Sequence, residues 1–252
     1  MQKLYKDRDW LYIMYRIKRI SISQIAEEMG ISRTPMHNWF HKLNIPIRSR
    51  AERTHLVEAN HCNLSQEARE WIDGELLGDG CLCSRSSYSA RISYGSKYPE
   101  YIQYVLDTLK SFGIEQSGRI KKYYNKKGNC YTYNYASRAY VELLPVRKRW
   151  YPEGKKIVPK DLELTPLILR QHYIGDGSLI HRKGKKPRII LATCSFPISD
   201  VEWLINKLKK LGFRATRQNF NNMISISTYS TQEFLDYIGK CPVKCYQYKW
   251  NY

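Results

Sequence analysis

Apolar residues near the start of the chain recur at helical spacing in two short segments. The first predicts a helix over residues 23–29 that Gly30 ends, because glycine tolerates the backbone turn that follows a helix. The second predicts a helix over residues 33–43, with Ser32 as its N-cap and Pro35 in its first turn. The side chains that would pack the two helices together are Ile25, Ala26, Met29, Met36, Trp39 and Phe40.

This pair of helices resembles a helix-turn-helix, which places its second helix in the major groove of DNA. Arginine and asparagine on such a helix can form paired hydrogen bonds with guanine and adenine edges. A helical hairpin that serves only packing or protein contacts is the alternative. The residues expected to face the groove are Arg33, Thr34, His37, Asn38 and His41.

A polar stretch follows this pair of helices, and its composition predicts a linker. We expect a helix-turn-helix domain over residues 1–50 and a linker over residues 51–63. Pro46 favours extended backbone just before the linker. Arg48 and Arg50 lie in this part of the chain, where we expect them to contact DNA phosphates.

The remainder of the chain repeats one pattern: an apolar residue, Gly-Asp-Gly, a small residue and leucine. It occurs at residues 77–82 and again at residues 174–179. Each copy ends a stretch with helical periodicity, and Ser65 and Thr165 are suited to cap the two helices. A single Gly-Asp-Gly is most simply a solvated turn, but two copies in matched contexts indicate one shared site.

The aspartates of this repeat, Asp79 and Asp176, are predicted at the C-termini of the two helices. We expect Gly80 and Gly177 to adopt the left-handed conformation that ends many helices. The helix dipole disfavours a carboxylate at that end by about 0.3–1 kcal/mol. A bound cation would reverse this cost.

The pattern downstream of each aspartate is also repeated. Alternating stretches predict two pairs of strands in each half, with a helix that ends at Gly113 or Gly212 between the pairs. Each half is thus predicted as helix, two strands, helix, two strands, helix. We therefore expect an α+β fold of two similar halves, residues 64–160 and 161–252, preceded by a small all-α domain.

Both copies of the repeat resemble the LAGLIDADG motif of homing endonucleases, and the resemblance covers residues 64–252. It implies a pseudo-twofold pair of αββαββα halves whose motif helices pack at the axis and whose sheets form a saddle over DNA. It also implies that Asp79 and Asp176 bind divalent metal. The carbonyls of Gly78 and Gly175 are close enough in sequence to contribute.

Two lysines extend the resemblance. Residues 155–159 (Lys-Lys-Ile-Val-Pro) are similar to the segment before the second motif of single-chain members, in which Lys156 matches a basic active-site residue. Residues 246–250 resemble the counterpart in the second half and indicate Lys249. An ordinary phosphate contact is the alternative for both lysines.

The second motif departs from the family pattern where the two helices should touch. Gly74 is the small residue that lets the helices approach in the first motif, whereas Gln171 stands at the matching position of the second. Two arrangements are open. Either the helix interface is less tight, or Gln171 faces outward.

The charge balance of the chain predicts the kind of partner that it binds. Forty-two Lys and Arg against 23 Asp and Glu give a formal net charge of +19, which favours a polyanion because each neutralised phosphate releases counterions. The 21 tyrosines can meet sugars and bases. A basic hairpin-like loop is expected to touch phosphates through Lys183, Lys185, Lys186 and Arg188.

Strand alternation leaves one choice open. Tyr131, Tyr133 and Tyr135 share one face of a predicted strand, and Thr132 and Asn134 share the other. Either face could meet DNA.

Other classes of protein are disfavoured. No run approaches the roughly 18 apolar residues of a membrane span, and the start of the chain lacks the apolar core of a signal peptide. We therefore expect an intracellular protein with no membrane partner. The seven cysteines lack paired CxxC spacing, which favours free thiols over a zinc site.

Together these features predict a site-specific double-strand DNA endonuclease that acts as a monomer on a long target site. Mg²⁺ is the expected cofactor, with Mn²⁺ or Ca²⁺ able to substitute in binding. Two alternatives remain: a non-catalytic transcriptional regulator built on the same fold, and an intron RNA maturase.

Overall fold

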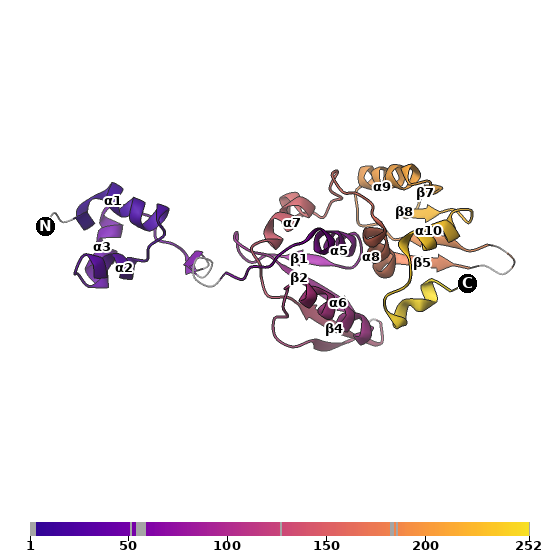
Figure 1. The fold of residues 1–252 in the computed structure, drawn as a ribbon, viewed down its shortest axis with the longest axis horizontal. Helices are drawn as coiled ribbons and strands as arrows, with labels where there is room; N and C mark the ends of the chain where they lie inside the picture. The colour runs from indigo at the N-terminus through magenta and orange to yellow at the C-terminus, as the bar shows by residue number, and fades with distance from the viewer. Residues whose placement is uncertain are drawn as a thin grey trace. The chain divides into compact units, whose positions relative to one another are not determined.

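The chain divides into two compact units, Met1–Ala59 and Asn60–Tyr252 (Figure 1). The computed structural model describes residues 4–50, 52–53, 59–126, 128–181, 184 and 186–251. No helix in these ranges is both long and apolar enough to cross a membrane.

The N-terminal unit contains both predicted helices, α2 (Ile22–Glu28) and α3 (Arg33–Lys42). Ser21 begins α2 with a reciprocal capping box to Gln24, whereas the hydroxyl of Ser32 makes no cap hydrogen bond to α3. Apolar residues from both helices and from the segments around them form the core of the unit: Leu11, Tyr15, Ile22, Ile25, Ala26, Met36, Phe40 and Ile45.

Three short elements precede this pair and were not predicted. They are the 3-10 turn η1 (Leu4–Lys6), α1 (Arg8–Tyr12) and the π-helical turn η2 (Ile13–Ile17). They supply Leu11 and Tyr15 to the core. The apolar spacing of so short a run, interrupted by a π turn, gives no regular 3.6-residue period to detect.

The first half of the larger unit has the predicted order of elements (Figure 1). Its four strands form one antiparallel sheet in the order β1-β2-β4-β3. The elements are α5 (Gln66–Leu77), β1 (Cys81–Cys83), β2 (Arg91–Ser96), α6 (Pro99–Ser111), β3 (Lys121–Asn125), β4 (Cys130–Ala136) and α7 (Leu143–Trp150).

The second half repeats this order after a connector that contains the 3-10 turn η3 (Pro152–Gly154). Its sheet has the equivalent order, β5-β6-β8-β7. The elements are α8 (Pro166–Asp176), β5 (Gly177–Ile180), β6 (Arg188–Leu191), α9 (Ile198–Lys210), β7 (Ala215–Gln218), β8 (Met223–Ile226), α10 (Thr231–Ile238) and the 3-10 segment η4 (Lys244–Lys249).

The two motif helices, α5 and α8, pack against each other between the sheets (Figure 1). Both predicted caps are present, because the Ser65 hydroxyl accepts from Ala68 N and the Thr165 hydroxyl accepts from Ile168 N. A Cβ built on Gly74 would lie 2.7 Å from the Ile168 carbonyl oxygen, so only glycine allows this approach.

The predicted left-handed conformation of Gly80 and Gly177 is wrong. Neither residue has a positive φ, and Gly177 has φ −87°. Lack of space explains these glycines instead. A Cβ on Gly80 would lie 2.7 Å from the carbonyl oxygen of Glu75, and one on Gly177 would overlap the ring of Tyr173.

Each sheet has one face covered by a helix. Helix α6 packs on β2 and β4, and α9 packs on β7 and β8. Tyr135 is buried on the covered face of the first sheet, with Tyr133 partly buried beside it. Strand alternation therefore leaves Thr132 and Asn134 on the opposite, open face.

Candidate active site

The C-terminal ends of α5 and α8 bring Asp79 and Asp176 together. A Cβ built on Gly175 would lie 3.1 Å from the backbone nitrogen of Asp79 and 3.7 Å from its Oδ2. A Cβ built on Gly78 would lie 3.5 Å from the Cα of Gly175 and 3.7 Å from the nitrogen of Asp176. The two copies of the repeat thus meet at one point of the molecule.

The electrostatics of the two carboxylates favour a cation. Burial, followed by repulsion from Asp79, raises the pKa of Asp176 to about 6. Burial also raises the pKa of Asp79, although this side chain reaches solvent. No described residue donates a hydrogen bond to either carboxylate. Two crowded acids without donors are stabilised most readily by a positive charge between them.

Two lysines occupy the carbonyl ends of the same helices. Lys156 Nζ donates to the carbonyls of Gly78 at 3.2 Å and Gly80 at 3.1 Å. Lys249 Nζ donates to Ile174 O at 2.6 Å and Gly175 O at 3.4 Å. Lys249 also donates to the Tyr173 carbonyl. Each lysine therefore neutralises the negative end of one motif helix.

The lysines also act across the pseudo-twofold axis. Lys156, near the end of the first half, lowers the pKa of Asp176 more than Lys249 does. Lys249, in η4 of the second half, lowers the pKa of Asp79 more than Lys156 does. Burial lowers the pKa of both lysines, that of Lys249 to about 8. Each acid is thus influenced most by the lysine of the other half.

The donor set fits a hard divalent cation. Mg²⁺ is commonly bound through one or two carboxylates and completes its shell with water and substrate phosphate. The two aspartates supply such a pair, and no group of three or more His, Cys, Asp or Glu suited to a metal occurs among the described residues. The carbonyls of Gly78 and Gly175 accept from lysines, and each oxygen keeps a second lone pair.

Gln171 faces the helix interface and is fully buried, so its outward orientation is excluded. A Cβ on Gly74 would lie 2.8 Å from the Gln171 Cβ, which makes the pair a large residue against a small one. In the amide orientation that satisfies its neighbours, Gln171 donates to Glu75 Oε1 at 2.9 Å and accepts from Trp71 Nε1 and Tyr104 OH, each at 3.1 Å. The interface is therefore tight and polar.

Glu75 and His172 occupy equivalent positions in the two motifs, and both are buried. Tyr101 OH donates to the Glu75 carboxylate at 2.9 Å, and burial raises the pKa of Glu75 to about 8. Burial lowers the pKa of His172 to about 3, and its Nε2 has no hydrogen-bond partner among the described residues. Neither residue was among the site residues predicted from the sequence. Their burial could have been predicted, because each polar side chain stands at a position where the helical spacing of apolar residues calls for an apolar one.

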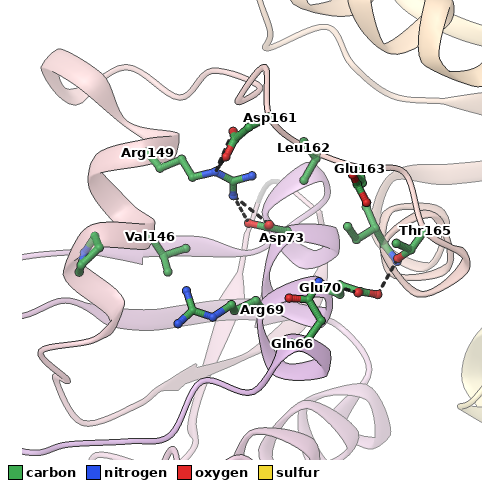
Figure 2. Close-up of a pocket in the computed structure, with 12 residues that line it drawn as sticks. Gln66, Arg69, Glu70, Asp73, Val146, Arg149, Asp161, Leu162, Glu163 and Thr165 are labelled. Atoms are coloured by element: carbon green, nitrogen blue, oxygen red, sulfur yellow. Dashed lines mark hydrogen bonds and ion pairs between the residues drawn. The ribbon is translucent and has the colours of Figure 1, made fainter.

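A polar cleft of about 350 Å³ lies at the N-terminal turns of α5 and α8 (Figure 2). Arg149 Nη1 donates to both oxygens of Asp73 at 2.9 Å, and its Nε donates to Asp161. Thr165 donates to Glu70 at 2.8 Å. These bonds fix both ends of the connector that carries Lys156.

The predicted DNA-contact residues are dispersed. On α3, Arg33, Thr34, Asn38 and His41 are exposed, and His37 is half-buried with its ring centroid 4.7 Å from that of His41. Arg50 is exposed as well. In the basic loop, Lys186 is exposed and Arg188 lies on β6, whereas Lys183 and Lys185 lie outside the described residues.

Arg48 is not available for the phosphate contact expected of it. It is buried, with its guanidinium over the ring of Tyr15. That guanidinium donates to the carbonyls of Tyr15, Arg19 and Ile20. Arg48 therefore holds the N-terminal unit together, and it is removed from the set of DNA-contact candidates.

None of the seven cysteines forms a disulfide. Cys81 and Cys83 lie on one face of β1 with their sulfurs 3.6 Å apart. One thiol donates a hydrogen bond to the other, and the pair forms no disulfide.

Comparisons with known proteins agree with this geometry. An uncharacterised protein of Methanocaldococcus jannaschii is 32% identical over 151 residues, which cover 59% of this chain and 58% of that relative, little more than half its length. The cytochrome b mRNA maturase bI2 of Debaryomyces hansenii is 23% identical over 91% of each chain.

Solved structures show the same fold. The homing endonuclease I-WcaI, in complex with its DNA recognition sequence, superposes with a TM-score of 0.66 at 19% identity, over 84% of this chain and 97% of that one. The model of the LAGLIDADG DNA endonuclease family matches residues 69–234, which include most of α5, all of α8 and both sheets. This protein therefore belongs to the LAGLIDADG DNA endonuclease family.

Proposed function

We propose that this protein is a site-specific endonuclease that cuts both strands of duplex DNA with the help of a divalent metal ion. The observation that carries this proposal is the meeting of Asp79 and Asp176 at the ends of two packed helices. Their raised pKa values and lack of hydrogen-bond donors support a role as metal ligands. A saddle of two sheets in one chain also supports action as a monomer.

Asp79 and Asp176 are the residues that would hold Mg²⁺, with the Gly78 and Gly175 carbonyls close by. Bound there, the metal supplies an activated water and neutralises charge on the phosphodiester. Lys156 and Lys249 add fixed positive charge on either side of the acids, where negative charge develops during cleavage. Because carbonyls hold both ammonium groups, their positions require no reorganisation.

DNA would lie on the open faces of the two sheets. The open face of the first sheet carries polar and basic side chains, including Arg91, Lys121 and Asn134, which are suited to phosphates and base edges. The I-WcaI structure, solved with its recognition sequence, supports this choice of partner. The exposed side of α3, with Arg33 and Asn38, would lengthen the target site.

Cleavage of one defined duplex tests the proposal. The duplex carries the uninterrupted insertion site of the protein's own gene, and we expect Mg²⁺-dependent cutting of both strands. Asp79→Asn and Asp176→Asn should each abolish cutting while retaining binding, because asparagine keeps the shape but not the charge. Tight binding without cleavage in Mg²⁺ or Mn²⁺ would instead indicate the non-catalytic regulator.

Maturation of an intron RNA is the second candidate function. It is supported by the match to the Debaryomyces hansenii maturase, which extends over 91% of both chains. The basic surface that suits DNA also suits structured RNA. The test is a splicing assay with the intron of the host gene, in which the Asp79→Asn variant should keep any splicing activity while losing cleavage.

A further inference from the structure

Phe220 is the most exposed large apolar side chain among the described residues, at 87%. It lies in the turn that joins β7 and β8. Single exposed apolar residues are common on protein surfaces, so exposure alone has no functional meaning. The surroundings of this one are unusual, because four amide side chains flank it: Gln218, Asn219, Asn221 and Asn222.

The turn that carries Phe220 is held firmly. Asn222, with φ 55°, donates its backbone N–H to Gln218 O at 2.9 Å and its side-chain Nδ2 to Phe196 O at 3.0 Å. The buried hydroxyl of Thr193 donates to Asn222 O at 2.7 Å. These bonds hold the backbone of the turn in place while the Phe220 ring stays exposed. Less conformational entropy is therefore lost when the ring binds a partner.

The same bonds place the turn at the active-site end of the second sheet. Ala192 N donates to the Asp176 carbonyl at 2.8 Å, and the next residue is Thr193, which anchors the turn. Phe196, which accepts from Asn222, has its ring 5.7 Å from Lys156 Nζ. Phe220 is therefore connected to both an acid and a lysine of the site through short chains of contacts.

The strand that leads to the turn identifies its face. Ala215 is buried and Arg217 pairs with Glu202 of α9 at 3.8 Å, so these residues lie on the covered face of the sheet. Thr216 and Gln218 alternate with them and lie on the open face, where we propose that DNA binds. Phe220 follows two residues later.

The chemistry of this turn matches a base step of duplex DNA. Amides bond base edges, and apolar side chains such as phenylalanine insert between base pairs and partly unstack them. We propose that Phe220 is a wedge that inserts into a base step of the target duplex beside the cut phosphates. The amides of Gln218 and Asn219 would bond the exposed base edges, whereas those of Asn221 and Asn222 bond within the protein and hold the turn. This inference rests on the proposed nuclease function.

Fluorescence of 2-aminopurine tests the wedge with the full chain. The duplex carrying the insertion site is labelled in turn at each step of its centre, and Ca²⁺ replaces Mg²⁺ so that binding proceeds without cutting. Wild-type protein should raise the fluorescence at one step, because unstacking relieves quenching. Phe220→Ala should abolish this rise and weaken binding about 10- to 100-fold.

Two variants control for folding and for general loss of an aromatic ring. Phe220→Trp keeps a stacking side chain and should keep the fluorescence rise. Tyr229→Ala removes another exposed ring of the second half, 71% accessible, and should bind as wild type does. All variants should melt within a degree or so of wild type, because both rings are largely exposed to solvent.

The outcomes separate the wedge from the nuclease. Mg²⁺-dependent cutting by wild type, with no fluorescence rise at any step or with an unchanged rise in Phe220→Ala, overturns the wedge and leaves the nuclease intact. Failure of wild type to bind the duplex overturns both. Loss of affinity in Phe220→Ala without any rise in wild type indicates a surface contact and also overturns the wedge.

Discussion

The two halves of the larger unit share one fold but differ in the chemistry of their motif helices. Gly74 in α5 faces Gln171 in α8, and Glu75 has His172 as its equivalent. The ends of the two helices remain alike, with Gly-Asp-Gly in both. Residues at the axis are complementary to each other rather than alike, whereas both helix ends present an acid.

The acids themselves are not equivalent. Asp79 reaches solvent, while Asp176 is half-buried with a pKa raised to about 6. The lysine that lowers the pKa of each acid most comes from the other half. The pseudo-twofold site is therefore better described as two composite half-sites than as one site from each half.

A substitution at Gly74, which packs against Gln171 at the axis, should cause the largest change in the free energy of unfolding. Gly74→Ala would put a Cβ 2.7 Å from a backbone oxygen, so the helices must separate, and we expect a loss of about 3 kcal/mol in the free energy of unfolding. Urea denaturation measures it. Gly78→Ala is the control, because its Cβ would meet Gly175 at an ordinary 3.5 Å. Equal losses in both variants would contradict the close packing at Gly74.

Removing the other member of the pair should cost somewhat less. Gln171→Ala leaves a cavity and deprives Trp71 Nε1 of the shorter of its two hydrogen bonds, and we expect a loss of about 2–3 kcal/mol in the free energy of unfolding. Gln66→Ala, an exposed position of α5, is the matched control and should be near neutral. If the two variants unfold alike, Gln171 does not bridge the helices.

Removing the charge of the half-buried acid should stabilise the protein. The folded pKa of Asp176, about 6, lies above the ordinary 3.8, so the folded state binds more protons between these values. This group therefore favours folding below about pH 4 and loses that contribution as pH rises through 6. Asp176→Asn should raise the free energy of unfolding by roughly 1–2 kcal/mol at pH 7.5 in EDTA, after allowance for solvent screening.

The gain from Asp176→Asn should disappear at pH 4, where the wild-type carboxyl is already protonated in the folded state. Urea denaturation at the two pH values measures it. A gain that is equal at both would show that charge burial is not its cause. Because the same variant should abolish cleavage, stability and activity would change in opposite directions.

Substitution of Lys156 or Lys249 should have the smallest effect, a change in the pKa values of the two aspartates. It tests directly whether each acid is influenced most by the lysine of the other half. Lys156→Met should raise the pKa of Asp176 more than that of Asp79, because a positive charge is removed. Lys249→Met should do the reverse. Carbon-13 titration of the two carboxyls measures both shifts. If each lysine affects the acid of its own half more, the crossed assignment is wrong.

The order of elements and the acids at their helix ends could be predicted because they depend on local signals. Caps at Ser65 and Thr165, helical and alternating periods, and a repeated Gly-Asp-Gly are all readable along the chain. The family resemblance then indicated the two lysines, whose positions at the helix carbonyls depend on the fold.

Other features could not be predicted because the same residue serves different purposes. Glycine can be needed for a left-handed backbone or because a neighbour leaves no room for a Cβ. Gly177 is needed for the second reason, since the ring of Tyr173 fills that room. Arginine can meet a phosphate or a set of backbone carbonyls, and Arg48 meets carbonyls. Deciding between such uses requires the neighbours, which come from segments distant along the chain.

The position of Lys249 has a consequence for the order of biosynthesis. Both aspartates leave the ribosome before this lysine, which lies well beyond Asp176 along the chain. At about 5–20 residues per second, the nascent chain holds both acids for several seconds before the second lysine is added. Under the proposed function, a nascent chain cannot cut DNA until Lys249 has been added and has reached the carbonyls at the end of α8.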